Sequence, residues 1–232
     1  MGGRFCSRAE GVRESFFAFV ASRMKIQIEK EFAPSKIVCV GRNYADHAAE
    51  LGNEVPKEPL LFLKAPSALI GNGDALLLPA QSRQVEHEAE LAVVIGRDCK
   101  DVSDDEDPFQ YVKGYTCLND VTARDLQKKD GQFARAKSFD TFCPIGPWIE
   151  TELDVSDVAV TCRVNGDVKQ TGRTSQMVFP VKFLIRYISR QMTLKAGDVI
   201  ATGTPSGVSS LTAGDVCEVE VEGIGILRNT VG

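Results

Sequence analysis

The stretch VEHEAELAVVIG at residues 85–96 places three glutamates at alternate positions, directly before an apolar run. Side chains two positions apart on a β-strand point to the same face, so Glu86, Glu88 and Glu90 are expected on one face. Beyond Glu90 both alternating sets of side chains become apolar, which is typical of a strand buried on both faces. The fold must therefore bury this strand in a sheet while accommodating carboxylates at its start.

Two interpretations of these acids remain open from the pattern alone. The stretch CEVEVEG at residues 217–223 alternates in the same way, and there a solvent-exposed face explains the glutamates. Glu88 and Glu90 differ because they enter a buried strand. Two carboxylates about 4–5 Å apart repel by roughly 3–4 kcal/mol at an effective dielectric of about 20, and burial adds a desolvation cost. A divalent cation would reverse the sign of that interaction, and all-oxygen ligation favours Mg²⁺, Mn²⁺ or Ca²⁺ over zinc.

Composition excludes several classes of protein. The chain has 232 residues and a net charge of −5, without a run of Lys and Arg, so nucleic acid is not an expected partner. No apolar run approaches the roughly 18 residues that a membrane span needs, so no membrane partner is expected. The seven cysteines are odd in number, irregularly spaced and without a CxxC motif. We expect reduced thiols and a cytoplasmic location.

The first residues of the chain are expected to form an extension upstream of the fold, which begins near Met24. We divide the chain into an N-terminal extension and lead-in at residues 1–34 and a catalytic domain at residues 35–232. The arginines and serines of residues 1–23 leave a mitochondrial presequence as the alternative location. Glu10 and Glu14 argue against it, because such peptides are poor in acidic residues.

Strand patterns dominate the rest of the chain and predict a mainly β fold with α+β elements, arranged as a mixed β-roll or sandwich. Asn165-Gly166 between two alternating runs predicts a hairpin. Two helices are expected. One covers residues 43–51 with Asn43 as its N-cap. The other covers residues 181–190 with Phe183, Leu184, Tyr187 and Ile188 on its apolar face.

Five motifs occur in a fixed order along the chain. They are GRNYADHAAELG (41–52), EHEAEL (86–91), LNDVTARDLQ (118–127), AKSF (136–139) and TGTPSGV (202–208). In this order they resemble the fumarylacetoacetate hydrolase superfamily over residues 35–231, most closely its acylpyruvate hydrolase/oxaloacetate decarboxylase branch.

The resemblance implies the mixed β-roll of the fumarylacetoacetate hydrolase C-terminal domain, a homodimer, and Mg²⁺ or Mn²⁺, with Ca²⁺ as a substitute in vitro. The implied metal ligands are Glu88, Glu90 and Asp120, and Glu86 is then a solvated neighbour. Without the resemblance, Asp120 reads as the cap of a helix that begins at Thr122.

The resemblance also implies roles for residues in the other motifs. His47 and Glu50, three apart on the first helix, would form a proton-transfer pair on a lid, and Lys137 would stabilise an enolate. Each of these side chains could otherwise be an ordinary surface residue. The implied substrate-binding residues are Arg42, Tyr44, Arg124, Gln127 and Thr204. His87 points away from Glu88 and Glu90 on a regular strand and is not assigned as a ligand.

The expected function is divalent-metal-dependent cleavage of a C–C bond in a small 2-oxo acid. Either acylpyruvate hydrolysis or oxaloacetate decarboxylation would proceed through a pyruvate enolate held at the metal. The first alternative is isomerisation or decarboxylation of a 2-hydroxy-diene-dioate from aromatic catabolism. The second is a β-sandwich binding module without catalysis, in which the acids are structural.

Overall fold

The computed structural model describes residues 24–28 and 32–232. The alternative of a mitochondrial presequence concerns residues 1–23, which lie outside the described residues. No helix within the described part of the chain is long and apolar enough to cross a membrane. The six cysteines that the structure describes are free thiols, and all are buried.

Two β-sheets form the body of the protein, so the expected mainly β fold with mixed sheets is confirmed. The larger sheet has eight strands: β1 (Lys25–Gln27), β10 (Cys143–Glu150), β8 (Val112–Asn119), β7 (Ala89–Ile95), β13 (Val199–Ala201), β2 (Ile37–Gly41) and β3 (Leu60–Lys64) in spatial order, with β4 (Leu69–Ile70) paired to β10. The second sheet has five strands: β12 (Asp167–Arg173), β11 (Ala159–Val164), β14 (Val216–Val221), β15 (Gly225–Val231) and β5 (Ala75–Leu76). A separate pair joins β6 (Val85–Glu86) to β9 (Thr122–Ala123).

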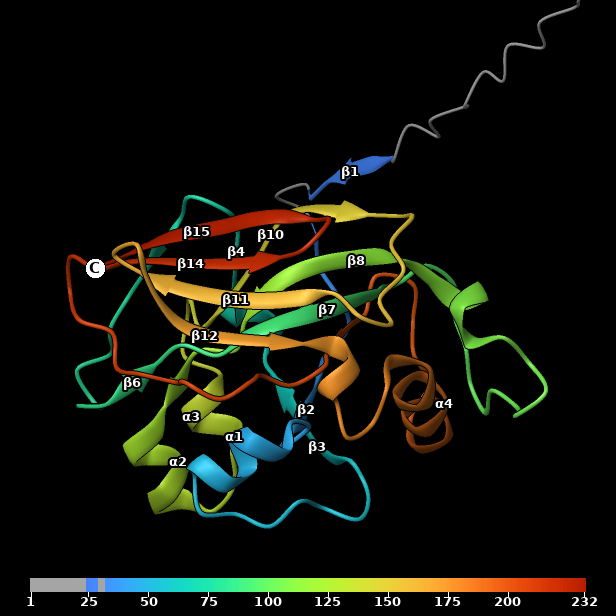
Figure 1. Ribbon diagram of the computed structural model, residues 1–232, viewed down its shortest axis with the longest axis horizontal. Coiled ribbons are helices and arrows are strands. Elements are labelled where there is room, and N and C mark those ends of the chain that lie inside the picture. Colours follow the sequence, from blue (N-terminus) through green and yellow to red (C-terminus); the bar gives the residue numbers. More distant parts are fainter. Residues whose placement is uncertain (1–23, 29–31) are drawn as a thin grey trace, which may run out of the picture.

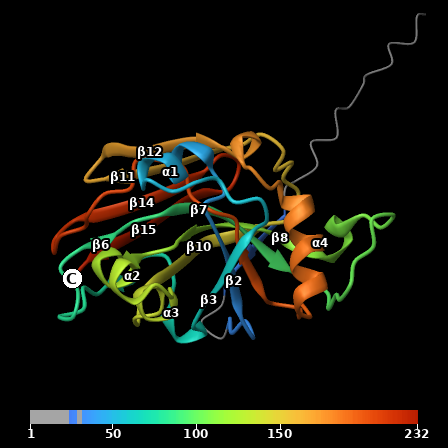
Figure 2. The ribbon, with the colours of Figure 1, turned by 90° about the horizontal axis from the view of Figure 1, so that it is seen from below.

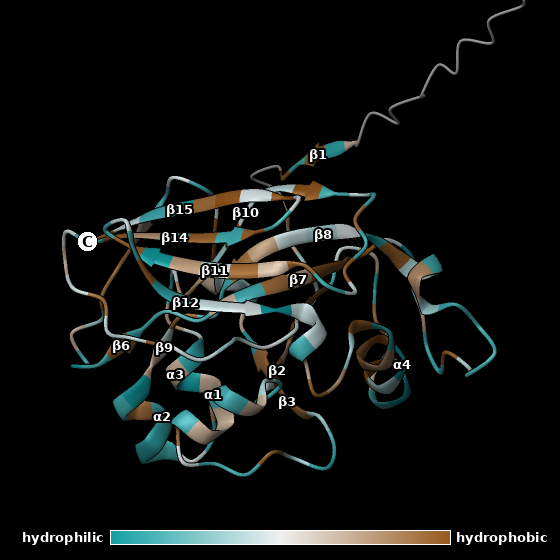
Figure 3. Ribbon diagram, in the orientation of Figure 1, coloured by the Kyte–Doolittle hydropathy of each residue, from teal (hydrophilic) through white to brown (hydrophobic). Residues whose placement is uncertain are grey.

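The two sheets stack on each other, and β11 and β14 contact the central strands β7 and β8 of the larger sheet. The helices α1 (Ala45–Glu50), α2 (Arg124–Asp130) and α3 (Ala134–Lys137) gather at one end, and α4 (Val181–Gln191) lies at the other (Figure 2). Short 3₁₀ turns cover Pro66–Ala68, Pro108–Tyr111 and Thr174–Gln176. The core lies between the sheets, whereas the exposed turns of α2 are hydrophilic (Figure 3).

The strand predictions are largely confirmed. Every residue of β7 is buried, as expected for an apolar run inside a sheet. The turn at Asn165-Gly166 joins β11 to β12, with both residues at positive φ as a tight hairpin turn requires. In β14 the glutamates alternate with buried apolar residues, so they line the outer face of that strand.

The helix predictions need two corrections. Asn43 is not an N-cap, because α1 begins at Ala45 after Tyr44. The buried Asn43 side chain instead accepts from Phe179 N at 2.8 Å and donates to Thr202 O at 2.7 Å, tying two loops together. In α4, Leu184 and Ile188 are buried, but Phe183 is 45% exposed and is not part of the core face.

Candidate active site

The start of β7 brings two distant acidic segments together. β7 and β8 are antiparallel with Ala89 opposite Asn119, so Glu88 and Asp120 lie just beyond the two paired ends. Asp120 N donates to Glu88 O at 2.9 Å, and Glu88 N donates to the Asn119 side chain at 2.9 Å. Strand register therefore sets the carboxylate of Asp120 beside those of Glu88 and Glu90.

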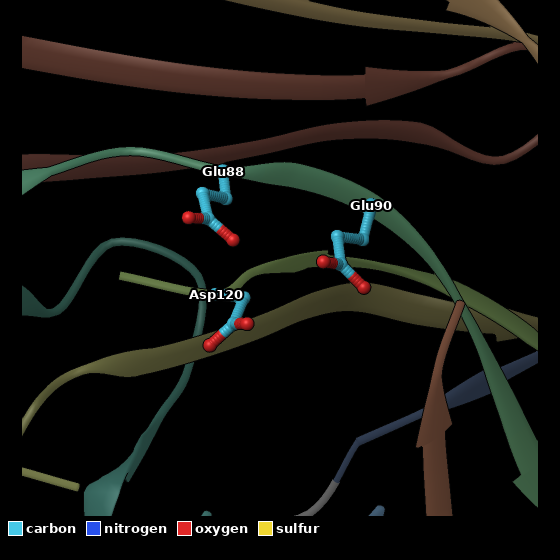
Figure 4. A group of neighbouring side chains, drawn as sticks. All are labelled: Glu88, Glu90 and Asp120. Atoms are coloured by element: carbon cyan, nitrogen blue, oxygen red, sulfur yellow. The ribbon is translucent and has the colours of Figure 1, made fainter. Parts of the chain in front are cut away.

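Glu88, Glu90 and Asp120 form one cluster. Each offers a carboxylate oxygen, and these oxygens all lie within 4.8 Å of one another. The three side chains are at most 5% exposed. Figure 4 shows Glu88 and Glu90 extending from one side of the same segment toward Asp120. Three buried carboxylates at this separation repel strongly unless positive charge lies among them.

Three buried cations supply part of that charge. The Lys137 ammonium donates to Asp120 Oδ2 at 2.6 Å and to Glu88 Oε2 at 2.8 Å. Lys64 donates to Asp120 Oδ1 at 2.7 Å. Arg124 Nη2 lies 2.5 Å from Glu88 Oε1. Asp120 and Glu88 are therefore held by ion pairs on both oxygens, which fixes the orientation of each carboxylate.

Glu90 is the exception in the cluster. It forms no ion pair with a cation in the part of the chain that the structure describes, and it accepts from Gly203 N at 2.7 Å. Burial, with Asp120 and Glu88 as further causes, raises the pKa of Glu90 well above its usual value. Burial also acts to raise the pKa of Glu88, but Lys137 and Arg124 outweigh it and hold that pKa well below its usual value. The protonated, neutral form of Glu90 is therefore favoured when no further cation lies at the cluster.

The donor set fits a hard divalent cation. All three side chains offer carboxylate oxygen, and no thiol or imidazole belongs to the cluster among the described residues. This chemistry matches Mg²⁺, Mn²⁺ or Ca²⁺ and disfavours zinc. A bound cation would also favour the ionised form of Glu90, which has no cationic partner among the described residues.

Glu86 is not the solvated neighbour that was expected. It is 6% exposed, and its carboxylate accepts from Arg124 Nε at 2.7 Å and from the Gln84 side chain at 2.7 Å. Glu86 therefore holds Arg124 in place, and Arg124 in turn holds Glu88. The prediction failed because alternation places a side chain on a face but does not reveal what covers that face.

Asp120 is not a helix cap. Thr122 and Ala123 form β9, and α2 begins at Arg124 with Ala123 at its N-cap position. The Asp120 carboxylate instead lies at the cluster, bonded to the two lysines.

A cavity of about 580 Å³ opens onto the acidic cluster. Besides the three acids, its walls include most of the residues expected to act in catalysis or substrate binding: Arg42, His47, Glu50, Arg124, Gln127, Lys137 and Thr204. Leu51, Leu60, Phe62 and Phe133 add an apolar side. Segments that are far apart in the sequence thus meet at one cavity.

Tyr44 is placed differently. It is 3% exposed and does not line the cavity, and its hydroxyl has no hydrogen-bond partner among the described residues. Burial, together with the Glu90 charge, raises the pKa of Tyr44.

His47 and Glu50 lie on α1 at the cavity wall. His47 Nδ1 is 3.2 Å from Glu50 Oε2, and the other carboxylate oxygen of Glu50 accepts from Gly207 N at 2.9 Å. A carboxylate accepts, so Nδ1 carries the hydrogen and Nε2 is left as a proton acceptor. The histidine is 5% exposed. The pair therefore has the geometry of an oriented general base.

Thr204 lies in the loop after β13. Its hydroxyl donates to Ala89 O at 2.8 Å and accepts from the Gln170 side chain at 2.7 Å. Gly203 has φ +98, and a Cβ there would lie 2.7 Å from Asn43 Cβ. The single hydroxyl hydrogen of Thr204 is therefore engaged within the protein and is not free to donate into the cavity.

Lys64 is the site residue that the sequence did not reveal. It closes the apolar strand β3, is 1% exposed, and reaches the cluster from the side opposite Lys137. The available signal was a lone lysine at the end of an apolar run, where an unpaired ammonium is costly. His87 behaves as expected, because it points away from the acids and bonds to Gln170 and Ser209.

Residues 36–232 match the family described as fumarylacetoacetate (FAA) hydrolase, C-terminal. The chain belongs to the fumarylacetoacetate hydrolase family. It is 56% identical over 202 residues to an uncharacterized protein of Methanocaldococcus jannaschii, covering 87% of this chain and 85% of that one. It is 41% identical over 229 residues to the oxaloacetate tautomerase YisK of Bacillus subtilis, covering 93% and 76% of the two chains.

Solved structures agree with this assignment. The crystal structure of a 5-carboxymethyl-2-hydroxymuconate delta-isomerase from Mycobacterium smegmatis superposes with a TM-score of 0.81 at 50% identity, covering 90% of this chain and 81% of that one. The predicted superfamily and its connection to oxaloacetate chemistry are thus confirmed. Members of the family are enzymes, which argues against a binding module without catalysis.

Proposed function

We propose that this protein is a divalent-metal-dependent enzyme that cleaves a C–C bond in a small 2-oxo acid, by acylpyruvate hydrolysis, oxaloacetate decarboxylation or both. The observation that carries the proposal is the buried cluster of Glu88, Glu90 and Asp120, which opens onto the same cavity as the pair His47 and Glu50. One wall holds a charge-stabilising centre and another holds a proton acceptor.

Glu88, Glu90 and Asp120 would hold Mg²⁺ or Mn²⁺. When bound, such a cation supplies Lewis acidity to the oxygens of a 2-oxo acid. Lys137 and Arg124 keep Glu88 ionised, and Lys64 and Lys137 fix both oxygens of Asp120. The cluster is therefore arranged before substrate arrives, which avoids reorganisation during the reaction.

His47 would act on water in the hydrolytic reaction. Its Nε2 takes one proton from water while Glu50 holds Nδ1, and the water oxygen bonds to the distal acyl carbon. The C–C bond then breaks, its electron pair stays on the pyruvate fragment as an enolate, and a proton returns to carbon. Decarboxylation needs no water, because CO₂ leaves directly and the same enolate remains. His47 is therefore required in the first reaction more than in the second.

The positive groups of the cavity would receive the substrate. Lys137 is buried beside the cluster, where its charge stabilises an enolate oxygen. Arg42 and Gln127 line the same cavity, and Gln127 accepts from Arg124 Nη1 at 2.6 Å. Thr204 belongs to the proposed substrate-binding set through the loop on which it lies, because its own hydroxyl hydrogen is bonded to Ala89 O. Tyr44 does not line the cavity and would contact the substrate only on closure of α1 as a lid. We also propose a homodimer as the functional assembly.

A second candidate is isomerisation, by proton transfer, of a 2-oxo acid or a 2-hydroxy-diene-dioate. It is favoured by the names of two relatives, an oxaloacetate tautomerase and a 5-carboxymethyl-2-hydroxymuconate delta-isomerase. Loss of one proton would give an enolate of the whole substrate, and a proton would return at another position without loss of a carbon fragment. The cavity of about 580 Å³ has room for a dicarboxylate.

One substrate screen tests both candidates. Acetylpyruvate, oxaloacetate and a 2-hydroxy-diene-dioate would be offered to the protein with Mg²⁺ and with Mn²⁺, using the Glu88→Gln variant as the blank. Release of pyruvate that depends on metal and on Glu88 supports C–C cleavage. Tautomerisation or isomerisation without pyruvate release supports the second candidate, and turnover of none of these compounds refutes both.

A further inference from the structure

Gln170 connects the second sheet to the candidate site. It is the one fully buried residue of β12 among positions 167–173, at 1% exposure. Its side-chain oxygen lies 2.8 Å from His87 Nδ1 and 3.0 Å from Ala89 N. Its side-chain nitrogen lies 2.7 Å from Thr204 Oγ1 and 2.7 Å from Pro205 O. All four hydrogen bonds end either on the segment that carries the cluster or on the loop after β13.

Backbone groups fix the direction of every bond in this set. Ala89 N–H can only donate, and Pro205 C=O can only accept, so the amide of Gln170 has one permitted orientation. The Gln170 oxygen therefore accepts from His87, which places the imidazole hydrogen on Nδ1. His87 Nε2 then accepts from the Ser209 hydroxyl at 2.8 Å. On the other side, Gln170 donates to Thr204, and Thr204 donates to Ala89 O.

Two glycines let the loop lie directly on β12. A Cβ at Gly207 would lie 2.0 Å from Lys169 O, and that glycine has φ +100. A Cβ at Gly172 would lie 2.6 Å from Pro205 Cβ. The loop is thus pressed against the strand on both sides of the Gln170 bonds. Gly207 N also donates to Glu50, so the position of the loop also affects the pair formed by His47 and Glu50.

We propose that Gln170 is a positioning residue: through an ordered chain of hydrogen bonds from Ser209 through His87, Gln170 and Thr204 to Ala89, it sets the loop after β13 against the metal-binding segment. This role rests on the proposed function, because the loop is placed where a 2-oxo acid would bind. Thr204 is then held by Gln170 and does not donate its hydroxyl hydrogen to the substrate. Gly203 N and Gly207 N already donate to Glu90 and Glu50, so the substrate carboxylate would be bound by other backbone N–H groups of the loop.

The tautomer of His87 tests the order of the bonds without any substrate. The chain has only two histidines, so ¹⁵N-histidine labelling gives two imidazoles, and the His47→Gln variant identifies the signals of His87. At about pH 8, where an ordinary histidine is neutral, we expect His87 to carry its hydrogen on Nδ1. In the Gln170→Leu variant we expect that preference to be lost. Hydrogen on Nε2 in the unmodified protein would overturn the proposed chain.

Binding of oxalate with Mg²⁺ tests the positioning role. Oxalate presents the adjacent oxygens of a 2-oxo acid, and calorimetry gives its dissociation constant. Gln170→Glu keeps the two bonds that the side chain accepts but cannot donate to Thr204 or Pro205. Gln170→Leu loses the accepted and the donated bonds alike. We expect oxalate to bind about tenfold to a hundredfold more weakly to each variant.

Val219→Ala is the matched control, because Val219 is buried in β14 of the same sheet and bonds to no site residue. It is expected to lower the melting temperature and to leave oxalate binding within about twofold. Unchanged oxalate binding in Gln170→Glu would overturn the positioning role, as would equal weakening in Val219→Ala. If the unmodified protein neither binds oxalate nor turns over a 2-oxo acid, the proposed function fails, and the positioning role fails with it. If instead the enzyme is active but His87 carries its hydrogen on Nε2, only the positioning role fails and the proposed function stands.

Discussion

The Lys64 ammonium lies 2.7 Å from Asp120 Oδ1, although 56 positions separate the two residues and both are buried. Removal of one partner from a buried ion pair typically costs about 3–5 kcal/mol, because the other charge is left without compensation. Lys137 still pairs with Asp120 in the Lys64→Met variant. The free energy of unfolding is therefore expected to fall by about 3 kcal/mol, the lower end of that range.

Urea unfolding in the absence of metal measures this loss. Lys195→Met, which breaks an exposed pair with Asp98, is the control and is expected to have little effect. A Lys64→Met protein as stable as its parent would show that the buried pair is not needed to hold Asp120. Added Mg²⁺ is expected to reduce the difference, because a cation replaces the missing charge.

Glu88→Gln tests the cluster by activity. The change keeps the shape of the side chain and removes its charge, so metal-dependent turnover of 2-oxo acids is expected to fall by at least about a hundredfold. The measurement is kcat/KM at saturating Mg²⁺. Glu218→Gln is the matched control. Glu218 also belongs to a run of alternating glutamates, but it lies on the outer face of β14. Equal activity in both variants would exclude Glu88 from the mechanism.

His47→Gln separates hydrolysis from decarboxylation. We expect acetylpyruvate hydrolysis to fall about a hundredfold or more, because water loses its proton acceptor, while oxaloacetate decarboxylation falls much less. Asp46→Asn changes the neighbouring exposed residue of α1 and is expected to leave both rates unchanged. Equal losses in the two reactions would remove His47 from water activation.

Glu90 predicts an unusual pH dependence for the metal-free protein. Burial, Asp120 and Glu88 raise its pKa in the folded state above the value of about 4.3 in the unfolded chain. Between those two pKa values the folded protein binds more protons than the unfolded protein. The contribution of Glu90 to stability is therefore lost as pH rises through the raised folded pKa.

The Glu90→Gln variant isolates this contribution. We expect the free energy of unfolding in EDTA to fall with rising pH in the unmodified protein relative to Glu90→Gln. The opposite trend belongs to Glu88, whose lowered pKa makes its contribution disappear as pH falls below about 4.3. A difference between the two proteins that is constant with pH would mean that Glu90 is not held protonated.

Much of the fold followed from local patterns. The buried run of β7, the hairpin at Asn165-Gly166 and the outer face of β14 depend on alternation and turn chemistry within a few residues, and each is found as expected. The helix boundary at Asn43 was missed, because its side chain bonds across the fold to Phe179 and Thr202. Such partners lie far away in the sequence and leave no local signal.

The candidate site was predictable to a lesser extent. Spacing placed Glu88 and Glu90 together, but Asp120 entered only through the family resemblance. Glu86 and Gln170 act through contacts between segments, so neither periodicity nor composition distinguishes them from ordinary strand residues. Lys64 left one signal, a charge at the end of an apolar run, but that signal does not reveal its partner. A buried charge network becomes visible only when the register of β7 and β8 is known.

The most direct test of the central claim is a crystal structure of the protein grown with Mn²⁺, with anomalous scattering recorded for the metal. We predict one strong anomalous peak per chain, bonded by carboxylate oxygens of Glu88, Glu90 and Asp120 and absent from crystals of the Glu88→Gln variant. Carboxylates that stay on Lys64, Lys137 and Arg124, with no peak among them at high Mn²⁺, would contradict the account.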